Sequence, residues 1–157
     1  MQRIYPIIAT CLAVSMLASC NQNLKKSKMA AVESEVLAVH EKMIKAAEAL
    51  DTEKMFQYIL DSEETVIQNN DRIENRQQAM QSVSKSFEGV RKLRYHIEQR
   101  QVAVLSPTMA EMTVKGKSVI ITDDNRVFTT PFSQTLRFVL TDGEWKIQYA
   151  IHITEEN

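Results

Sequence analysis

Cysteine is scarce in this sequence, and its placement excludes several kinds of chemistry. Of the 157 residues only Cys11 and Cys20 carry a thiol, and both lie near the N-terminus. The chain after Cys20 therefore has no disulfide, no cysteine-ligated zinc site and no cysteine nucleophile. Histidine occurs three times, and histidines without paired carboxylates nearby make a poor metal site. We expect neither a metal nor another cofactor.

Glycine and proline are also scarce, and neither sign of charge is in excess. The chain has three glycines and three prolines, so its loops are expected to be short. It shows no internal repeat and no low-complexity tract. Nineteen basic and twenty acidic side chains give a formal charge of −1. This balance disfavours nucleic acid as a partner.

The N-terminus has the layout of a secretory signal. Arg3 is the one charge in residues 1–19, and Ile7 to Leu17 is almost wholly apolar. The apolar run is shorter than the about 20 residues that a membrane-spanning helix needs. A single membrane-spanning helix with a chance cysteine is the less favoured alternative.

The motif LASC at residues 17–20 resembles the lipobox of bacterial lipoproteins, in which cleavage falls before the cysteine. The resemblance implies that residues 1–19 are removed and that Cys20 becomes a lipidated first residue, held at a membrane by several acyl chains. Asn21 follows the cysteine, whereas an aspartate there would favour retention at an inner membrane. We therefore expect an outer-membrane lipoprotein that faces the periplasm.

Residues 20–31 are polar and are expected to be a lipidated tether. The segment carries Lys25, Lys26 and Lys28. These lysines either face water or contact anionic headgroups, at about 1 kcal/mol each. The rest of the chain, residues 32–157, has the length of one domain.

Helical spacing marks the first half of this domain. The expected helices are residues 33–50, 53–60 and 76–90. Apolar residues spaced three and four apart form the stripe of the first helix: Val36, Val39, Met43, Ala46, Ala47 and Leu50. Asp51 or Thr52 can cap the second helix, and Asn75 can cap the third.

Alternating patterns mark the strands, most of them in the second half. The expected strands are residues 64–70, 93–105, 108–122, 127–140 and 144–154. The alternation drifts in phase along residues 93–105, which predicts a β-bulge near Arg100. The turns are Asp123-Asp124-Asn125 and Thr141-Asp142-Gly143. Helices followed by an antiparallel meander make an α+β class.

This order of elements resembles the nuclear transport factor 2-like, or SnoaL-like, fold. The segments AEALDTEKMFQYILDSEETVI and DGEWKIQYAIHIT carry the likeness, which covers residues 33–155. The resemblance implies a cone-shaped, curved antiparallel sheet wrapped around the N-terminal helices, with one open mouth. Members of the family include enzymes, binding subunits and proteins without known activity, so the fold cannot name the chemistry.

Ketosteroid isomerases are members of this family whose chemistry is understood. They use one tyrosine and two aspartates, and the resemblance places these positions at Met43, Gln68 and Gln134. A thioether and two amides cannot abstract a proton near neutral pH. The resemblance therefore argues against that isomerase chemistry here.

The same resemblance implies a mostly apolar pocket with few polar groups. Its candidate lining residues are Met43, Phe56, Gln68, Met112, Phe132, Gln134, Leu136, Gln148 and His152. Such a pocket suits a small, largely apolar ligand, and a protein-interaction role stays open beside it. Both are non-catalytic. The alternative is a lyase, isomerase or hydrolase that uses His152 as acid or base, with His40 approaching from the first helix.

The register of the last strand has two interpretations. The resemblance turns Lys146, Gln148, Ala150 and His152 inward. It leaves Trp145, Ile147 and Tyr149 on the convex face, where exposed apolar residues predict a homodimer interface. Periodicity alone places Trp145 and Ile151 in the core instead. We favour the register of the resemblance.

Overall fold

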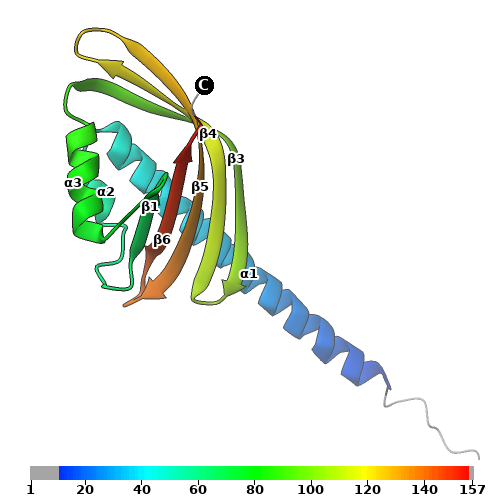
Figure 1. Ribbon diagram of the computed structural model, residues 1–157. Helices are drawn as coiled ribbons and strands as arrows, with labels where there is room; N and C mark the ends of the chain where they lie inside the picture. Colours follow the sequence, from blue (N-terminus) through cyan, green and yellow to red (C-terminus); the bar gives the residue numbers. More distant parts are fainter. Residues whose placement is uncertain (1–10, 156–157) are drawn as a thin grey trace, which may run out of the picture.

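The computed structural model describes the backbone of residues 11–155 and the side chains from Lys26 to Glu155. The helices are α1 (Cys11–Glu48), α2 (Thr52–Phe56) and α3 (Arg76–Ser86). The strands are β1 (Val66–Asn69), β2 (Arg72–Glu74), β3 (Val90–Ser106), β4 (Met109–Thr122), β5 (Val127–Thr141) and β6 (Glu144–Thr154). They form one curved sheet in the order β2-β1-β6-β5-β4-β3, with α1 crossing it (Figure 1).

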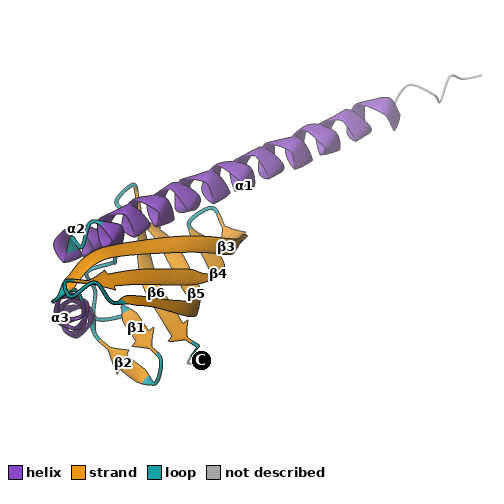
Figure 2. Ribbon diagram, turned by 90° about the horizontal axis from the view of Figure 1, so that it is seen from above, coloured by secondary structure: helices purple, strands orange, loops and turns teal. Residues whose placement is uncertain are grey.

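The first helix is longer than the sequence predicts. It continues back to Cys11 through the segment expected to be a tether, and this part projects beyond the sheet (Figure 2). Residues 1–10 of the predicted signal lie outside the described residues, as does the side chain of Cys20. No helix in the described stretch is both long and apolar enough to cross a membrane. Cleavage and lipidation therefore stay predictions.

The helix ends follow local chemistry. Asp51 is the cap of α2, because its carboxylate accepts from the backbone N–H of Lys54 at 2.9 Å. Asn75 caps α3 in a capping box with Gln78. Both helices end earlier than the sequence predicts, and after α3 the chain turns through Gly89, which has a φ of +73°.

The sheet contains one strand that the sequence does not predict. The pattern indicated a single strand at residues 64–70, whereas the chain forms a hairpin of β1 and β2 that turns at Asn70, with a φ of +52°. β1 also pairs in parallel with β6. The polar, three-residue β2 lacks the alternation that would have identified it.

The predicted bulge in β3 is confirmed. The register of β3 against β4 shifts between Ile97 and Gln99, close to the Arg100 that the sequence indicated. The shift keeps Tyr95 and Ile97 on the same face as Arg100. Opposite Ile97, a Cβ on Gly116 would overlap the carbonyl oxygen of His96, so glycine is required there.

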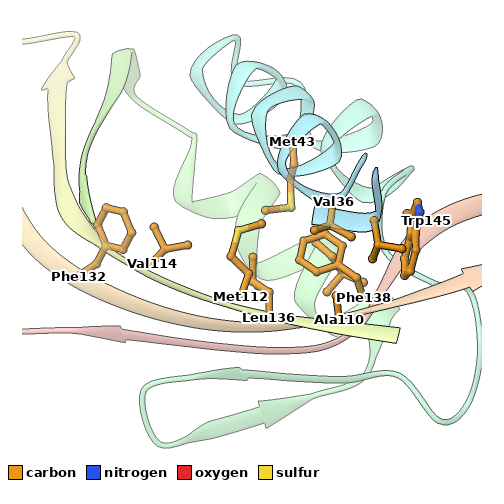
Figure 3. Close-up of a cluster of buried hydrophobic side chains, with 11 residues drawn as sticks. Val36, Met43, Ala110, Met112, Val114, Phe132, Leu136, Phe138 and Trp145 are labelled. Atoms are coloured by element: carbon orange, nitrogen blue, oxygen red, sulfur yellow. The ribbon is translucent and has the colours of Figure 1, made fainter. Parts of the chain in front are cut away.

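The main core lies between α1 and the concave face of the sheet (Figure 3). Its buried members include Val36, Met43, Met112, Phe138 and Trp145. The indole Nε1 of Trp145 donates to the Glu35 carboxylate on α1 at 2.6 Å, so the one tryptophan joins β6 to the helix.

This core position overturns the favoured register of β6. Trp145 is 6% exposed and Ile147 is 1% exposed, so neither lies on the convex face. The cause is a bulge: Arg137 pairs with Tyr149 but Phe138 pairs with Ile147, which leaves Gln148 as the extra residue. The register predicted from periodicity is correct for the residues before the bulge. The register implied by the resemblance is correct for the residues after it.

The predicted dimer interface is wrong in its composition for the same reason. Of its three central residues only Tyr149 faces outward. Its ring lies 5.8 Å from the guanidinium of Arg137, which pairs with Glu111 at 2.6 Å. This part of the convex face is therefore partly charged.

Candidate ligand cavity

A cavity of about 200 Å³ lies between the sheet and the helices. It is smaller than the about 300–1,000 Å³ usual for small-molecule sites, so it suits a small ligand. Met43 of α1, Phe56 of α2 and Val83 of α3 form part of its helical wall. The wall from the sheet includes Leu136 of β5 and His152 of β6.

Six of the nine candidate residues line this cavity. They are Met43, Phe56, Gln68, Gln134, Leu136 and His152. Gln68 is engaged locally, because its amide donates to the backbone oxygen of Asn70 at 2.8 Å.

The other three candidates lie elsewhere. Met112 is fully buried in the core beneath α1. Phe132 lies beneath the wall, 3% exposed, where its ring stacks on His152 at 5.4 Å and meets Tyr95 edge-on at 5.5 Å. Gln148 sits at the bulge and donates to Glu64 at 3.3 Å, so it does not reach the cavity.

The polar pair of the cavity is Gln134 and His152. These residues face each other across β5 and β6, and the amide Nε2 of Gln134 lies 3.0 Å from Nδ1 of His152. Burial lowers the pKa of His152 below its usual 6.5, because desolvation penalises the imidazolium. At neutral pH His152 is therefore a neutral imidazole.

His40 lies deeper than the sequence indicates. It belongs to the buried stripe of α1 and is 0% exposed, although it does not line the cavity. Burial lowers its pKa to about 4, and the positive charge of Arg100 acts in the same direction. The neighbouring Gln134 amide raises the pKa, yet in this geometry neither ring nitrogen has a hydrogen-bond partner among the described residues.

Two titratable groups of the cavity wall were missed in the sequence. Tyr95 alternates with Leu93 and Ile97 and could have been assigned to the wall from that pattern; burial and the nearby Glu48 raise its pKa to about 12. Glu74 comes from β2, the strand that the pattern did not reveal, and accepts from the Ser82 hydroxyl at 2.6 Å.

The hydrogen-bond partner of His152 in this wall is uncharged. Within the described residues, neither nitrogen of His152 has a carboxylate at hydrogen-bond distance, and the partner of Nδ1 is the Gln134 amide. In that same part of the chain, no three His, Cys, Asp or Glu side chains gather closely enough to hold a metal ion.

The sequence profile of the SnoaL-like domain family matches residues 36–152. The chain belongs to the SnoaL-like family. The match spans α1 to β6 and includes every residue of the cavity wall. No curated protein is similar enough in sequence to serve as a guide to activity.

Solved structures similar to this SnoaL-like domain share its fold at low identity. A presumed scytalone dehydratase from Novosphingobium aromaticivorans has a TM-score of 0.75 at 11% identity, over 83% of this chain and 89% of its own. A nuclear transport factor 2-like protein from Salmonella enterica has a TM-score of 0.73 at 12% identity, over 82% and 94%. A presumed dehydratase of the same family from Streptomyces avermitilis has a TM-score of 0.69 at 12% identity, over 79% and 96%.

These likenesses confirm the predicted fold class. At such identity they carry no information about substrate. A SnoaL-like domain can bind a ligand or act as an enzyme, so the choice rests on the cavity.

Proposed function

We propose that this chain is a lipid-anchored envelope protein whose SnoaL-like domain binds a small, largely apolar molecule without transforming it. The observation that carries the proposal is the cavity of about 200 Å³, with a mostly apolar wall and the Gln134–His152 pair. Such a lining favours an apolar ligand that is oriented by one or two hydrogen bonds.

The composition of the wall favours binding over catalysis. The resemblance to ketosteroid isomerases places Met43, Gln68 and Gln134 at the positions where those enzymes carry titratable groups, and none of the three can exchange a proton near neutral pH. His152 can, but its neighbour is an amide and not a charged group that would tune it.

Replacing Gln134 by leucine tests the binding role. We expect any molecule that co-purifies with the parent to be lost or reduced, because the ligand and His152 both lose a hydrogen-bond partner. Mass spectrometry of the purified protein provides the measurement. Ser133→Ala, on the opposite face of β5, is the matched control. Equal ligand content in the parent and in Gln134→Leu would reject the role.

The second candidate function is a lyase, isomerase or hydrolase. The observation in its favour is that neutral His152 and Tyr95 both line the cavity. A turnover that falls by orders of magnitude in His152→Ala, with the fold retained by circular dichroism, would replace the binding proposal by this one.

The membrane anchor belongs to the proposal through Cys20. Replacing Cys20 by alanine should move the protein from the membrane fraction into the soluble fraction, because the acyl chains are lost. The outer membrane, on its periplasmic side, is the proposed site. A Cys20→Ala variant that sediments with membranes as the parent does would contradict lipidation.

Self-association through the convex face is proposed with a corrected composition. Tyr149, Ile151 and Ile153 alternate along β6 after the bulge, and Ile153 is 45% exposed. Sedimentation velocity of the Cys20→Ala chain at micromolar concentration should show a dimer, which Ile151→Lys should dissociate. A monomer at every concentration would reject the dimer.

A further inference from the structure

Four buried side-chain atoms near the cavity have no hydrogen-bond partner among the described residues. They are both ring nitrogens of His40, Nε of Arg100 and Oε1 of Gln134. Buried polar groups are nearly always paired, so each such atom requires an explanation. One arrangement accounts for all four.

The sheet brings three of the side chains involved into one row. Arg100 pairs with Val114, Val114 with Gln134, and Gln134 with His152. Between Arg100 and Gln134 the row holds only the short, apolar Val114. The adjacent Glu41 of α1 pairs with Arg100 at 3.0 Å, which places the fully buried His40 beside this row, and both Arg100 and the Gln134 amide shift the His40 pKa.

The unpaired atoms match one another as donors and acceptors. Arg100 Nε–H can only donate and Gln134 Oε1 can only accept, whereas neutral His40 has one N–H and one lone pair. His40 can therefore accept from Arg100 Nε–H with one ring nitrogen and donate to Gln134 Oε1 with the other. These two bonds together would satisfy all four atoms.

Only one orientation of the Gln134 side-chain amide allows this pairing of donors and acceptors. If the Gln134 amide were flipped, its NH₂ would face His40, and His40 would need to donate toward Arg100. The guanidinium has no acceptor. Arg100 is itself held by the Glu41 carboxylate at 3.0 Å. The cation therefore sets the orientation of the amide.

The oriented amide determines the proton position on His152. Gln134 Nε2 can only donate, so Nδ1 of His152, at 3.0 Å, must accept and the ring proton must be on Nε2. We propose that Arg100, His40, Gln134 and His152 form a directed hydrogen-bond chain. The chain holds His152 as its Nε2–H tautomer and makes the cavity select ligands with a neutral acceptor oxygen, such as a carbonyl.

His40 and Arg100 are positioning residues in this scheme, because neither lines the cavity. The ligand class rests on the binding function proposed above, whereas the tautomer does not. The two parts are therefore tested separately.

Nitrogen-15 NMR of the full chain, without ligand, tests the tautomer. Of the three histidines, His96 is exposed on β3, and His96→Gln identifies its signals. We expect His152 to show a pyridine-type Nδ1 and a pyrrole-type Nε2. The opposite assignment, or a mixture of tautomers in the parent, would overturn the proposal without any variant.

Two substitutions at His40 test the relay. His40→Phe keeps a ring but removes both polar atoms, so the Gln134 amide becomes free to flip and His152 should become a mixture of tautomers. His40→Gln keeps one donor and one acceptor and should restore the single Nε2–H form. An unchanged His152 spectrum in a folded His40→Phe would reject the relay. If that variant does not fold, Arg100→Leu, which removes the cation, takes its place with the same expected mixture.

A pair of single-ring probes tests the ligand class. Acetophenone carries an acceptor oxygen, and ethylbenzene has a similar shape without one. The parent should bind acetophenone about two- to tenfold more tightly, the range of one neutral hydrogen bond, as followed by His152 chemical shifts, and His40→Phe should lose the preference. Equal affinities would reject the ligand class. Binding of neither probe, beside a fixed Nε2–H tautomer, would count against the binding function and not against the relay.

Discussion

The two ends of the concave interior share β5 and β6 but are filled differently. At one end Val36, Met112, Phe138 and Trp145 pack beneath α1 with almost no exposed surface (Figure 3). At the other end the wall leaves a cavity of about 200 Å³. Both ends lie within one domain and one sheet.

The bulge at Gln148 lies near the boundary between these two ends on β6. Before it the inward side chains are the large Trp145 and Ile147, and after it they are Ala150 and His152. Small Ala150 and Ala79 both line the cavity and leave its space open. Ile147, Ala150 and His152 line the cavity, whereas Trp145 does not, so the large side chains of β6 give way to smaller ones along the cavity wall.

The largest expected difference between the ends is the cost of removing an aromatic ring. Phe138→Ala should lower the free energy of unfolding by about 3–5 kcal/mol, because a fully buried ring leaves a void that the packed end cannot close. Phe87→Ala, in the cavity wall, should cost clearly less because Phe87 is only partly buried. Urea unfolding of both variants measures the difference. Equal losses would remove the distinction between the two ends.

The next effect is the pH dependence of stability that the buried His40 causes. The pKa of His40 is about 4 in the folded protein against 6.5 for the ordinary group. Between pH 4 and pH 6.5 the unfolded chain therefore binds a proton at His40 that the folded protein does not bind. The contribution of neutral His40 to the free energy of unfolding is therefore fully present above about pH 6.5. We expect the free energy of unfolding to fall by about 3 kcal/mol toward pH 4, at about 1.4 kcal/mol per pKa unit. Burial of His152 acts in the same direction.

Urea unfolding between pH 7 and pH 4.5 measures this dependence. His40→Gln cannot titrate and should flatten the curve, with the remaining slope due to His152 and the carboxylates. A parent curve as flat as that of His40→Gln would show that His40 is not buried as a neutral group.

A smaller effect tests how β6 is fastened to α1 at the packed end. Glu35→Gln replaces the carboxylate that accepts from the Trp145 indole with a neutral amide. We expect a loss of about 0.5–1.5 kcal/mol, since the hydrogen bond loses its charge. Glu33→Gln, also exposed on α1, is the control and should change stability little. Thermal unfolding that does not distinguish the two variants would contradict this anchoring.

The smallest expected effect on stability comes from filling the open end. Ala150→Leu places added methyl groups into existing space, so the free energy of unfolding should change by less than about 1 kcal/mol. Ligand content should nevertheless fall sharply. Ile151→Leu on the opposite face of β6 is the control. Undiminished ligand in Ala150→Leu would place the binding site elsewhere.

Local patterns identified most of the elements because each pattern reflects a local cause. The stripe from Val36 to Ala47 predicted the buried face of α1, and Asp51 and Asn75 predicted helix caps. The drifting alternation around Arg100 predicted the bulge in β3. The hairpin strand β2 was missed, because three polar residues carry no alternation to detect.

The candidate site was only partly predictable for the same reason. Alternation along β5 placed Gln134 and Leu136 in the wall, and both line the cavity. Gln148 was wrongly predicted to face the pocket, because the bulge in β6 changes the direction of this side chain without interrupting the alternating pattern of the sequence. Glu74 was not foreseen because its strand was not.

The sequence by itself determined the α+β class, the likeness to the SnoaL-like family and the apolar faces that drive packing. Only the tertiary structure decided where the core ends and the cavity begins, because that depends on which side chains meet across strands distant in sequence. His40 shows this most clearly. In the sequence it is a polar residue beside an apolar stripe, and only the fold buries it between Arg100 and Gln134, where its hydrogen bonds acquire a direction.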